Sequence, residues 1–168
     1  MAHIGKDVRL NEPAYVHETA DIYGKVTLAR DVTIWPYVVM RAEMHEIIIG
    51  ERTNIQDFVM VHVGGTTPTI VGRNCSITHH VTIHGCTIGD NCLIGINATI
   101  MDGAVIGNNC IVAGHSIVTE NSVFPDNSII AGAPAKVIRT RDSGEANKAN
   151  AEWYFQNGLR YAKGIERQ

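Results

Sequence analysis

Residues 88–130 read IGDNCLIGINATIMDGAVIGNNCIVAGHSIVTENSVFPDNSII, and a large apolar residue recurs at every sixth position of this stretch. These marker residues are Ile88, Ile94, Ile100, Ile106, Val112, Val118, Phe124 and Ile130. A small residue tends to follow four positions after each marker, and glycine often comes directly after it. A helix would place its apolar residues three or four apart and would be weakened by this many glycines. The stretch therefore predicts short strands joined by tight turns.

The same period continues toward the N-terminus in three further runs, over residues 16–40, 49–61 and 71–83. With 88–130 they contain 19 markers. A hexapeptide period is typical of a parallel β-helix with three hexads per coil, so the runs predict about six coils. The period breaks between Met40 and Ile49 and between Val61 and Val71, where we expect insertions. Between Ile83 and Ile88 the period is one residue short.

The hexads stop after Ile130, and the sequence GAPAK follows at 132–136. Residues 143–167 are alanine-rich and charged, and Tyr154, Tyr161 and Ile165 would share one face of a helix, with Trp153 nearby. The sequence therefore predicts two parts, a β-helix over residues 1–140 and a helix within 141–168. We expect the helix to lie back along the β-helix and cover apolar surface.

The composition excludes several classes of function. A net charge of −3 does not indicate a nucleic-acid partner. No apolar stretch approaches the length of a membrane span and the N-terminus has no apolar signal segment, so we expect a cytoplasmic protein without a membrane partner. The four cysteines form no CxxC pair. Three of them, Cys75, Cys92 and Cys110, are expected to stack inside the β-helix as small apolar side chains.

Four of the eight histidines fall within residues 61–86, VHVGGTTPTIVGRNCSITHHVTIHGC. Three hexads separate Val61 from Ile83, so His62 and His84, one residue after each, are expected to stack on one face of adjacent coils. By the same count Arg41 lies in this column, one coil before His62. Two imidazoles one coil apart can bind a single zinc ion at about 2.0–2.1 Å.

His79 follows its marker, Ile77, by two residues and shares a second column with Asp57, round the corner from His62 and His84. It is expected to reach a metal on a neighbouring β-helix rather than on its own. Two histidines from one chain and one from the next would leave a coordination position for water, as in catalytic zinc sites. Such a site requires an oligomer, most simply a closed trimer.

Four motifs resemble those of the γ-class carbonic anhydrases and their bacterial hexapeptide-repeat relatives: MRAE at 40–43, NIQD at 54–57, VHV at 61–63 and THHVTIHGC at 78–86. The resemblance covers nearly the whole chain. It implies an all-β solenoid, namely a left-handed parallel β-helix with a C-terminal α-helix, that forms a homotrimer with Zn²⁺, Fe²⁺ or Co²⁺ at each subunit interface. It also implies that the metal ligands are His62, His79 and His84. The catalytic residues that it implies are Arg41, Glu43, Gln56, Asp57 and Tyr154.

The resemblance implies a lyase in which metal-bound hydroxide adds to CO2 and gives bicarbonate. Gln56 would orient the hydroxide or the substrate, and Arg41 and Asp57 would pair across the interface. Two features depart from the family: Glu43 stands where an aspartate is usual, and the GGTTPT loop at 64–69 has no carboxylate to serve as a proton shuttle.

Three alternatives stay open. Hexapeptide-repeat acyltransferases share the fold, and the GAPAK stretch resembles their coenzyme A end, in which case His115 would be the base. A second alternative is a metal-binding or assembly subunit without enzymatic activity. The third is hydrolysis of a small thioester at the same metal.

Overall fold

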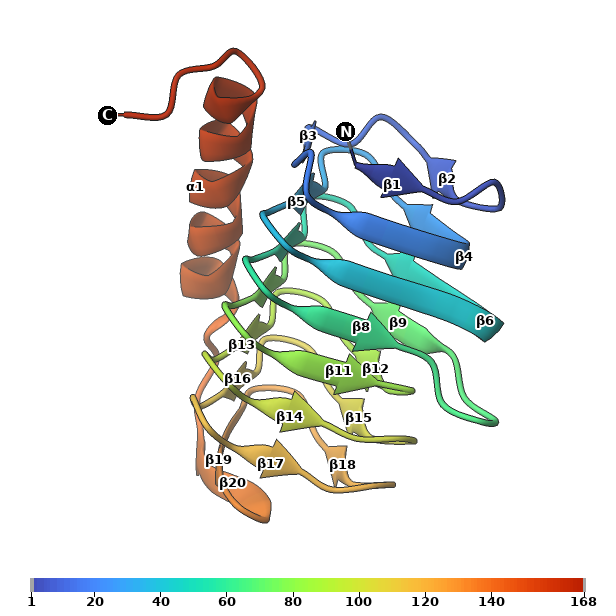
Figure 1. Cartoon of the computed structure of the whole chain (residues 1–168). Helices are drawn as coiled ribbons and strands as arrows, with labels where there is room; N and C mark the ends of the chain where they lie inside the picture. The colour runs from blue at the N-terminus through green and yellow to red at the C-terminus, as the bar shows by residue number, and fades with distance from the viewer. Residues whose placement is uncertain (1, 168) are drawn as a thin grey trace.

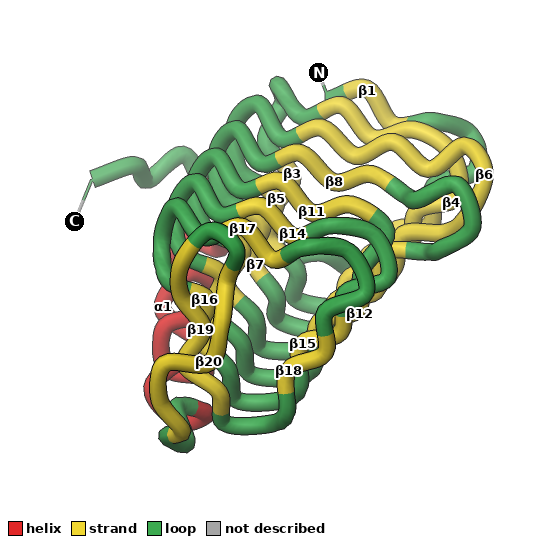
Figure 2. Tube along the Cα trace, turned by 90° about the horizontal axis from the view of Figure 1, so that it is seen from below, coloured by secondary structure: helices red, strands yellow, loops and turns green. Residues whose placement is uncertain are grey.

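The computed structural model describes residues 2–167 and shows a parallel β-helix of about seven coils with a single helix along its side (Figure 1). Seen along the stack, successive coils overlay as a three-sided tube (Figure 2). The predicted all-β solenoid with a C-terminal helix is thus confirmed. Among the described residues, no helix is long and apolar enough to cross a membrane.

The first face of the tube, here named the helix-covered face, is an eight-stranded sheet. Its strands in chain order are β3 (Tyr15–Val16), β5 (Thr33–Ile34), β7 (Asn54–Ile55), β10 (Ser76–Ile77), β13 (Leu93–Ile94), β16 (Ile111–Val112), β19 (Ser128–Gly132) and β20 (Ala135–Thr140). All pairs are parallel except β19 with β20, which form an antiparallel hairpin across the GAPAK turn. The hairpin closes the end of the tube where the hexads stop.

The other two faces are joined in one twelve-stranded sheet, because two long strands run across the corner between them. These long strands are β4 (Asp21–Leu28) and β6 (Val39–Ile49). The second face, here named the histidine face, continues with β8 (Met60–His62), β11 (Thr82–His84), β14 (Thr99–Ile100) and β17 (Ile117–Val118). The third face continues with β9 (Thr69–Val71), β12 (Thr87–Ile88), β15 (Val105–Ile106) and β18 (Val123–Phe124).

The insertion expected between Met40 and Ile49 lies within the long strand β6, where the pairing with β4 shifts register after Ala42. These residues extend a strand that pairs with β8 at one end and with β9 at the other, and they form no separate loop. The expected number of coils was too low. Strands β1 (His3–Ile4) and β2 (Arg9–Leu10) pair with the two halves of β4 and add a first coil. Their markers, Ile4 and Leu10, are exposed, since no coil precedes them to cover them.

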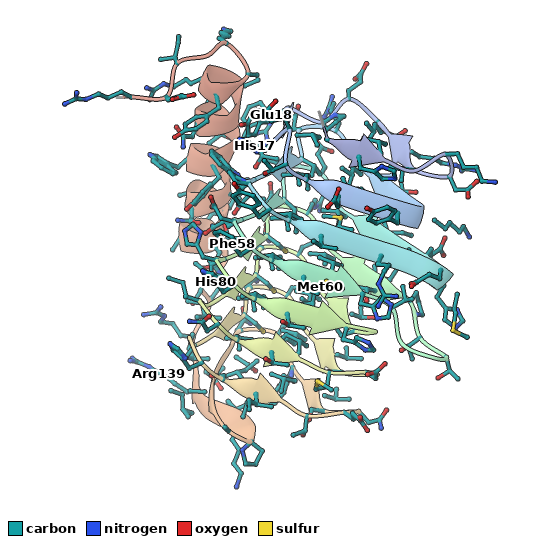
Figure 3. All side chains as sticks on the ribbon, viewed as in Figure 1. His17, Glu18, Phe58, Met60, His80 and Arg139 are labelled. Carbon is teal, nitrogen blue, oxygen red and sulfur yellow. The ribbon has the colours of Figure 1, made fainter. Side chains whose placement is uncertain are left out.

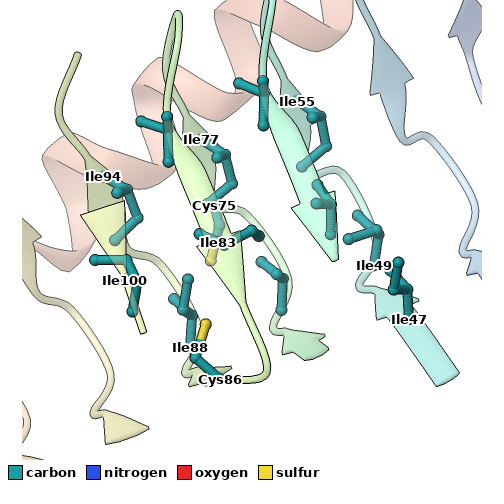
Figure 4. Packing of buried hydrophobic residues seen from close by; sticks show 14 of the residues in the cluster. Ile47, Ile49, Ile55, Cys75, Ile77, Ile83, Cys86, Ile88, Ile94 and Ile100 are labelled. Atoms are coloured by element: carbon teal, nitrogen blue, oxygen red, sulfur yellow. The ribbon is translucent and has the colours of Figure 1, made fainter. Parts of the chain in front are cut away.

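The marker residues fill the interior of the tube, and Figure 4 shows several of them packed from coil to coil. Twelve large side chains are fully buried, and eleven of them are hexad markers between Ile22 and Ile100, namely nine isoleucines, Leu28 and Met40.

 The twelfth, Ile47, is a further isoleucine that lies outside the hexad series, two residues before Ile49. The expected cysteine column is confirmed, since Cys75, Cys92 and Cys110 are all buried. The apolar interior is therefore continuous along the stack.

The turns that lead onto the helix-covered face hold a ladder of asparagines in the left-handed backbone conformation. Asn74, Asn91, Asn109 and Asn127 have φ values of 54°, 54°, 59° and 63°. Each of the first three donates from Nδ2 to Oδ1 of the next, at 3.1–3.2 Å. Asparagine adopts this conformation more readily than other residues that carry a Cβ. The ladder therefore fixes the same turn in successive coils.

The helix α1 (Gly144–Tyr161) lies against β3, β5, β7 and β10 of the helix-covered face. Its buried residues are Gly144, Asn147, Ala151 and Gly158, so a stripe of small side chains lets it approach the sheet closely. The expected helical face was partly wrong. Ile165 lies beyond the end of α1 and Trp153 is 49% exposed, whereas Tyr154 and Tyr161 do pack on Trp35.

Arg52 of the β-helix holds α1 by two contacts, and a third contact holds Arg52 itself in place. Its guanidinium is 2.9 Å from Glu152 on α1, 2.8 Å from Asp31 on the neighbouring turn, and 4.5 Å from the centre of the Phe155 ring. The helix is thus bound by charge as well as by close packing. That residues 1–140 and 141–168 form separate domains stays a prediction, because this contact gives no measure of their independence.

Candidate metal centre

His62 and His84 lie side by side at the ends of β8 and β11 on the histidine face. The register pairs His84 with His62, and His62 with Arg41, so the expected column of three residues is confirmed. Nδ1 of His62 is 2.9 Å from Nε2 of His84, and the ring centres are 4.8 Å apart. Both side chains are partly exposed, at 21% and 33%, so an ion can reach them from solvent.

The two outer nitrogens of this pair each face a carboxylate. Nε2 of His62 is 3.0 Å from Oε2 of Glu43, and Nδ1 of His84 is 2.8 Å from Oδ2 of Asp102. Because an ionised carboxylate only accepts hydrogen bonds, each outer nitrogen must donate its proton there. The two inner nitrogens of the neutral rings then carry lone pairs that face each other. A cation between them turns this repulsion into attraction, so the donor set fits a divalent metal that prefers imidazole, such as zinc.

Glu43 is held in its ionised form. Burial alone would raise the pKa of the Glu43 carboxyl, but hydrogen bonds from its own backbone and from His62, together with the charge of Arg41, lower this pKa below its usual value. Arg41 forms its ion pair with Glu43 of the same chain. The pairing of Arg41 with an acidic residue of a neighbouring chain therefore stays a prediction, and here Arg41 neutralises the carboxylate that orients His62.

His79 lies at the other end of the same face. It occupies the turn that precedes β11, whereas His84 is the last residue of that strand. Nδ1 of His79 is 3.0 Å from Oδ2 of Asp57, as expected from their shared column. Among residues 2–167, no three His, Cys, Asp or Glu side chains of one chain are grouped closely enough to hold a metal ion. The structure therefore brings together two of the three expected ligands.

The corner that carries His79 also carries exposed aromatic rings. Phe58 and His80 stack with their ring centres 4.9 Å apart and their planes within 1°, and Tyr37 stacks on the other side of Phe58. Figure 3 labels Phe58 and His80 at this corner, and Met60 further along the face. His79 thus projects from an edge with apolar side chains that a second copy of the chain could cover.

Two expected catalytic residues lie on the His79 side. Gln56 is buried, at 1% exposure, and donates from Nε2 to Oδ1 of Asn54 at 2.9 Å. Tyr154 on α1 packs edge-on against Trp35, and burial, with a smaller contribution from the charge of Asp57, raises the pKa of its hydroxyl. Within one chain, neither residue is grouped with His62 and His84, and their catalytic roles stay predictions. Both would join that pair only across an interface.

Asp102 contacts His84 and was not among the expected site residues. Ile100 pairs with Ile83 in the neighbouring coil, so Met101 lies in the row of His84. Asp102 is the next residue, and the count of hexads therefore places it one residue beyond that row. Asp102 could therefore be found from the sequence by following the row one residue beyond His84. An open cavity of about 310 Å³ lies in front of the pair and is lined by Arg41, Glu43, Met44, His62, Val63, Gly64, Gly65 and His84.

His115, the expected base of the acyltransferase alternative, lies elsewhere. It occupies an exposed turn in the left-handed conformation, with φ of 57°, and its contact is with Nδ2 of Asn97 at 3.5 Å. No carboxylate orients its ring among the described contacts. A histidine base is usually held in one tautomer by a third group, as in catalytic triads.

The fold and the repeat define the class of protein. Residues 85–120 match the family model described as bacterial transferase hexapeptide (six repeats). A solved structure, a hexapeptide transferase family protein from Anaplasma phagocytophilum, has a TM-score of 0.81 and 29% identity, covering 94% of this chain and 92% of that one. The chain is a hexapeptide-repeat protein with the left-handed β-helix of its structural neighbours, which confirms the expected hand.

Sequence relatives narrow the class to a family. The chain is 45% identical over 160 residues to a protein of Methanocaldococcus jannaschii named "Probable carbonic anhydrase", covering 95% of this chain and 94% of that one. It is 37% identical over 99 residues to gamma carbonic anhydrase 1 of Arabidopsis thaliana, covering 55% of this chain and 36% of that one. A match to Protein YrdA of Escherichia coli, at 37% identity, covers 56% of this chain and about half the length of that protein, 55%. This chain belongs to the γ-carbonic-anhydrase-like family.

Proposed function

We propose that this protein is a metal-dependent lyase that hydrates CO2 to bicarbonate, with the metal bound between chains of a homotrimer. The ligands would be His62 and His84 of one chain and His79 of a neighbouring chain. The observation that carries the proposal is the pair of inward-facing nitrogens of His62 and His84, 2.9 Å apart, with both outer nitrogens on carboxylates. Relatives named carbonic anhydrases support the choice of reaction.

A divalent metal held by three imidazoles lowers the pKa of bound water to about 7 and so makes it nucleophilic at neutral pH. The chain's own residues would keep this site ordered. Asp102 and Glu43 fix the rings of His84 and His62, and Arg41 compensates the charge of Glu43. Because the pKa of Glu43 is lowered, this carboxylate is a weak proton acceptor and serves to orient His62 rather than to carry the released proton.

The trimer explains the places of the other expected residues. His79, Asp57, Gln56 and Tyr154 lie around the corner next to α1, away from the cavity at His62 and His84. If a neighbouring chain lays this corner against the cavity, Gln56 and Tyr154 form its opposite wall.

We expect the protein to hydrate CO2 only when loaded with zinc, iron or cobalt. The test is stopped-flow hydration with a pH indicator on metal-free and reloaded protein, with acetyl-CoA turnover measured in parallel. His115→Ala is the matched control and should keep full activity. Fully loaded protein that hydrates no CO2 would contradict the proposal.

A second candidate is acyl transfer, since the matching family model and the Anaplasma structure carry transferase names. It predicts acetyl-CoA turnover that needs no metal and falls with His115→Ala. The first proposal is favoured, because among the described contacts no carboxylate orients the exposed ring of His115.

A further inference from the structure

The loop between β8 and β9, residues 63–68, is folded onto the metal centre. Gly64 donates its backbone N–H to the carbonyl of Thr67 at 2.9 Å, which closes a tight turn. At the end of the loop, the hydroxyl of Thr69 donates to the carbonyl of His62 at 2.5 Å and accepts the N–H of Gly85 at 2.8 Å. The loop is thus tied to the residue that follows His84 in the next coil.

Thr67 carries a buried hydroxyl that has no hydrogen-bond partner. Within residues 2–167, its Oγ1 is one of two buried side-chain polar atoms in this state, and the other is Nε of Arg52. Buried hydroxyls are nearly always hydrogen-bonded, so an unpaired one calls for an explanation. Packing does not explain why residue 67 carries a hydroxyl, since a valine would fill the same volume.

The hydroxyl of Thr67 lies beside Asp102, on the oxygen that His84 does not use. A Cβ on Gly64 would lie 2.1 Å from Oδ1 of Asp102 and 2.2 Å from Oγ1 of Thr67. A Cβ on Gly85 would lie 2.6 Å and 2.4 Å from the same two atoms. The two oxygens therefore flank the same small space, which two glycines leave open. A small rotation of either side chain within this space brings them into hydrogen-bond contact.

We propose that Thr67 is a positioning residue for the metal ligand His84. Its hydroxyl donates to Oδ1 of Asp102, which holds Oδ2 of Asp102 on Nδ1 of His84, so that the lone pair of His84 stays on Nε2. This inference rests on the proposed function, because the lone pair has its use in binding the metal. Groups behind a metal ligand commonly fix its tautomer and raise its affinity in this way.

The test compares Thr67→Val, which removes the hydroxyl at constant volume, with Thr67→Ser, which restores it. Thr66→Val, a change at the exposed neighbouring threonine, is the matched control. In metal-free protein, imidazole ¹⁵N NMR should show the Nδ1–H tautomer of His84 in wild type, Thr67→Ser and Thr66→Val, and a mixture of tautomers in Thr67→Val. Zinc affinity, measured by chelator competition, should fall by about 10–100-fold in Asp102→Asn and by up to about tenfold in Thr67→Val.

An unchanged tautomer and unchanged zinc affinity in Thr67→Val would overturn the inference, as would an equal loss of affinity in Thr66→Val. Should Thr67→Val not fold, Thr67→Ala takes its place: it must shift the tautomer of His84 while Thr67→Ser must not. A wild-type protein that binds zinc through His84 but does not hydrate CO2 contradicts the proposed function and leaves this inference standing.

Discussion

Replacing His84 with alanine is expected to abolish stoichiometric zinc binding and to leave the β-helix folded. The change removes one of the two converging nitrogens, and a single remaining imidazole on that chain gives no chelate. The loss of affinity should exceed the 10–100-fold or so that follows loss of a group behind a ligand. Since His84 is partly exposed and contributes nothing to the interior, the fold should persist. Metal content per chain after dialysis, with circular dichroism as a check on the fold, measures both effects.

His80→Ala is the matched control for this experiment. His80 also lies within the histidine-rich stretch, but its ring stacks on Phe58, and the strand register pairs His84 with His62 and not with His80. We expect this variant to keep its zinc. Full zinc occupancy in His84→Ala, or equal losses in both variants, would mean that His84 is not a ligand.

Ile94→Ala is expected to lower the free energy of unfolding by about 2–5 kcal/mol, the range typical of large-to-small changes in a close-packed core. Ile94 is fully buried in β13, paired with Ile77 in one neighbouring coil and with Val112 in the other. The cavity cannot close easily, because the backbone hydrogen bonds on both sides fix the spacing of the coils. The midpoint of denaturant unfolding, read by circular dichroism, measures the change.

Ile96→Ala is the matched control, because it removes an isoleucine that does not lie in the core. Ile96 lies two residues further along the chain and is 48% exposed, so its replacement should change stability by no more than about 0.5 kcal/mol. Similar midpoints for the two variants would show that the hexad markers do not form the core.

The interior and the column of His62 and His84 could be predicted from the sequence because a hexapeptide period fixes the register. Three hexads return the chain to the same face, so counting from Val61 to Ile83 is enough to place the two histidines together, and the same count separates them from His79. The hand of the β-helix could not be derived in this way, since the period is the same for either hand, and it came from the family resemblance.

Other features depend on contacts that a period does not encode. The first coil, by contrast, could have been predicted, since Leu10 and Ile4 continue the period six and twelve residues before Val16. The break after Met40 gave no sign that β6 continues across a corner, since a long strand and a loop break the period alike. The bonds of Glu43 and Asp102 to the histidines depend on side-chain conformations across coils, which the order of residues does not specify.

The most direct test of a metal site shared between chains is to mix two inactive variants. One carries His79→Ala, and the other carries both His62→Ala and His84→Ala, so neither has a complete set of ligands. After mixed refolding, an intact His79 can face an intact pair of His62 and His84 at some interfaces. We predict that zinc binding and CO2 hydration return at a fraction of the sites in the mixture and in neither variant alone. If mixing restores no zinc, or if His79→Ala alone keeps full zinc occupancy, the shared three-histidine site is contradicted.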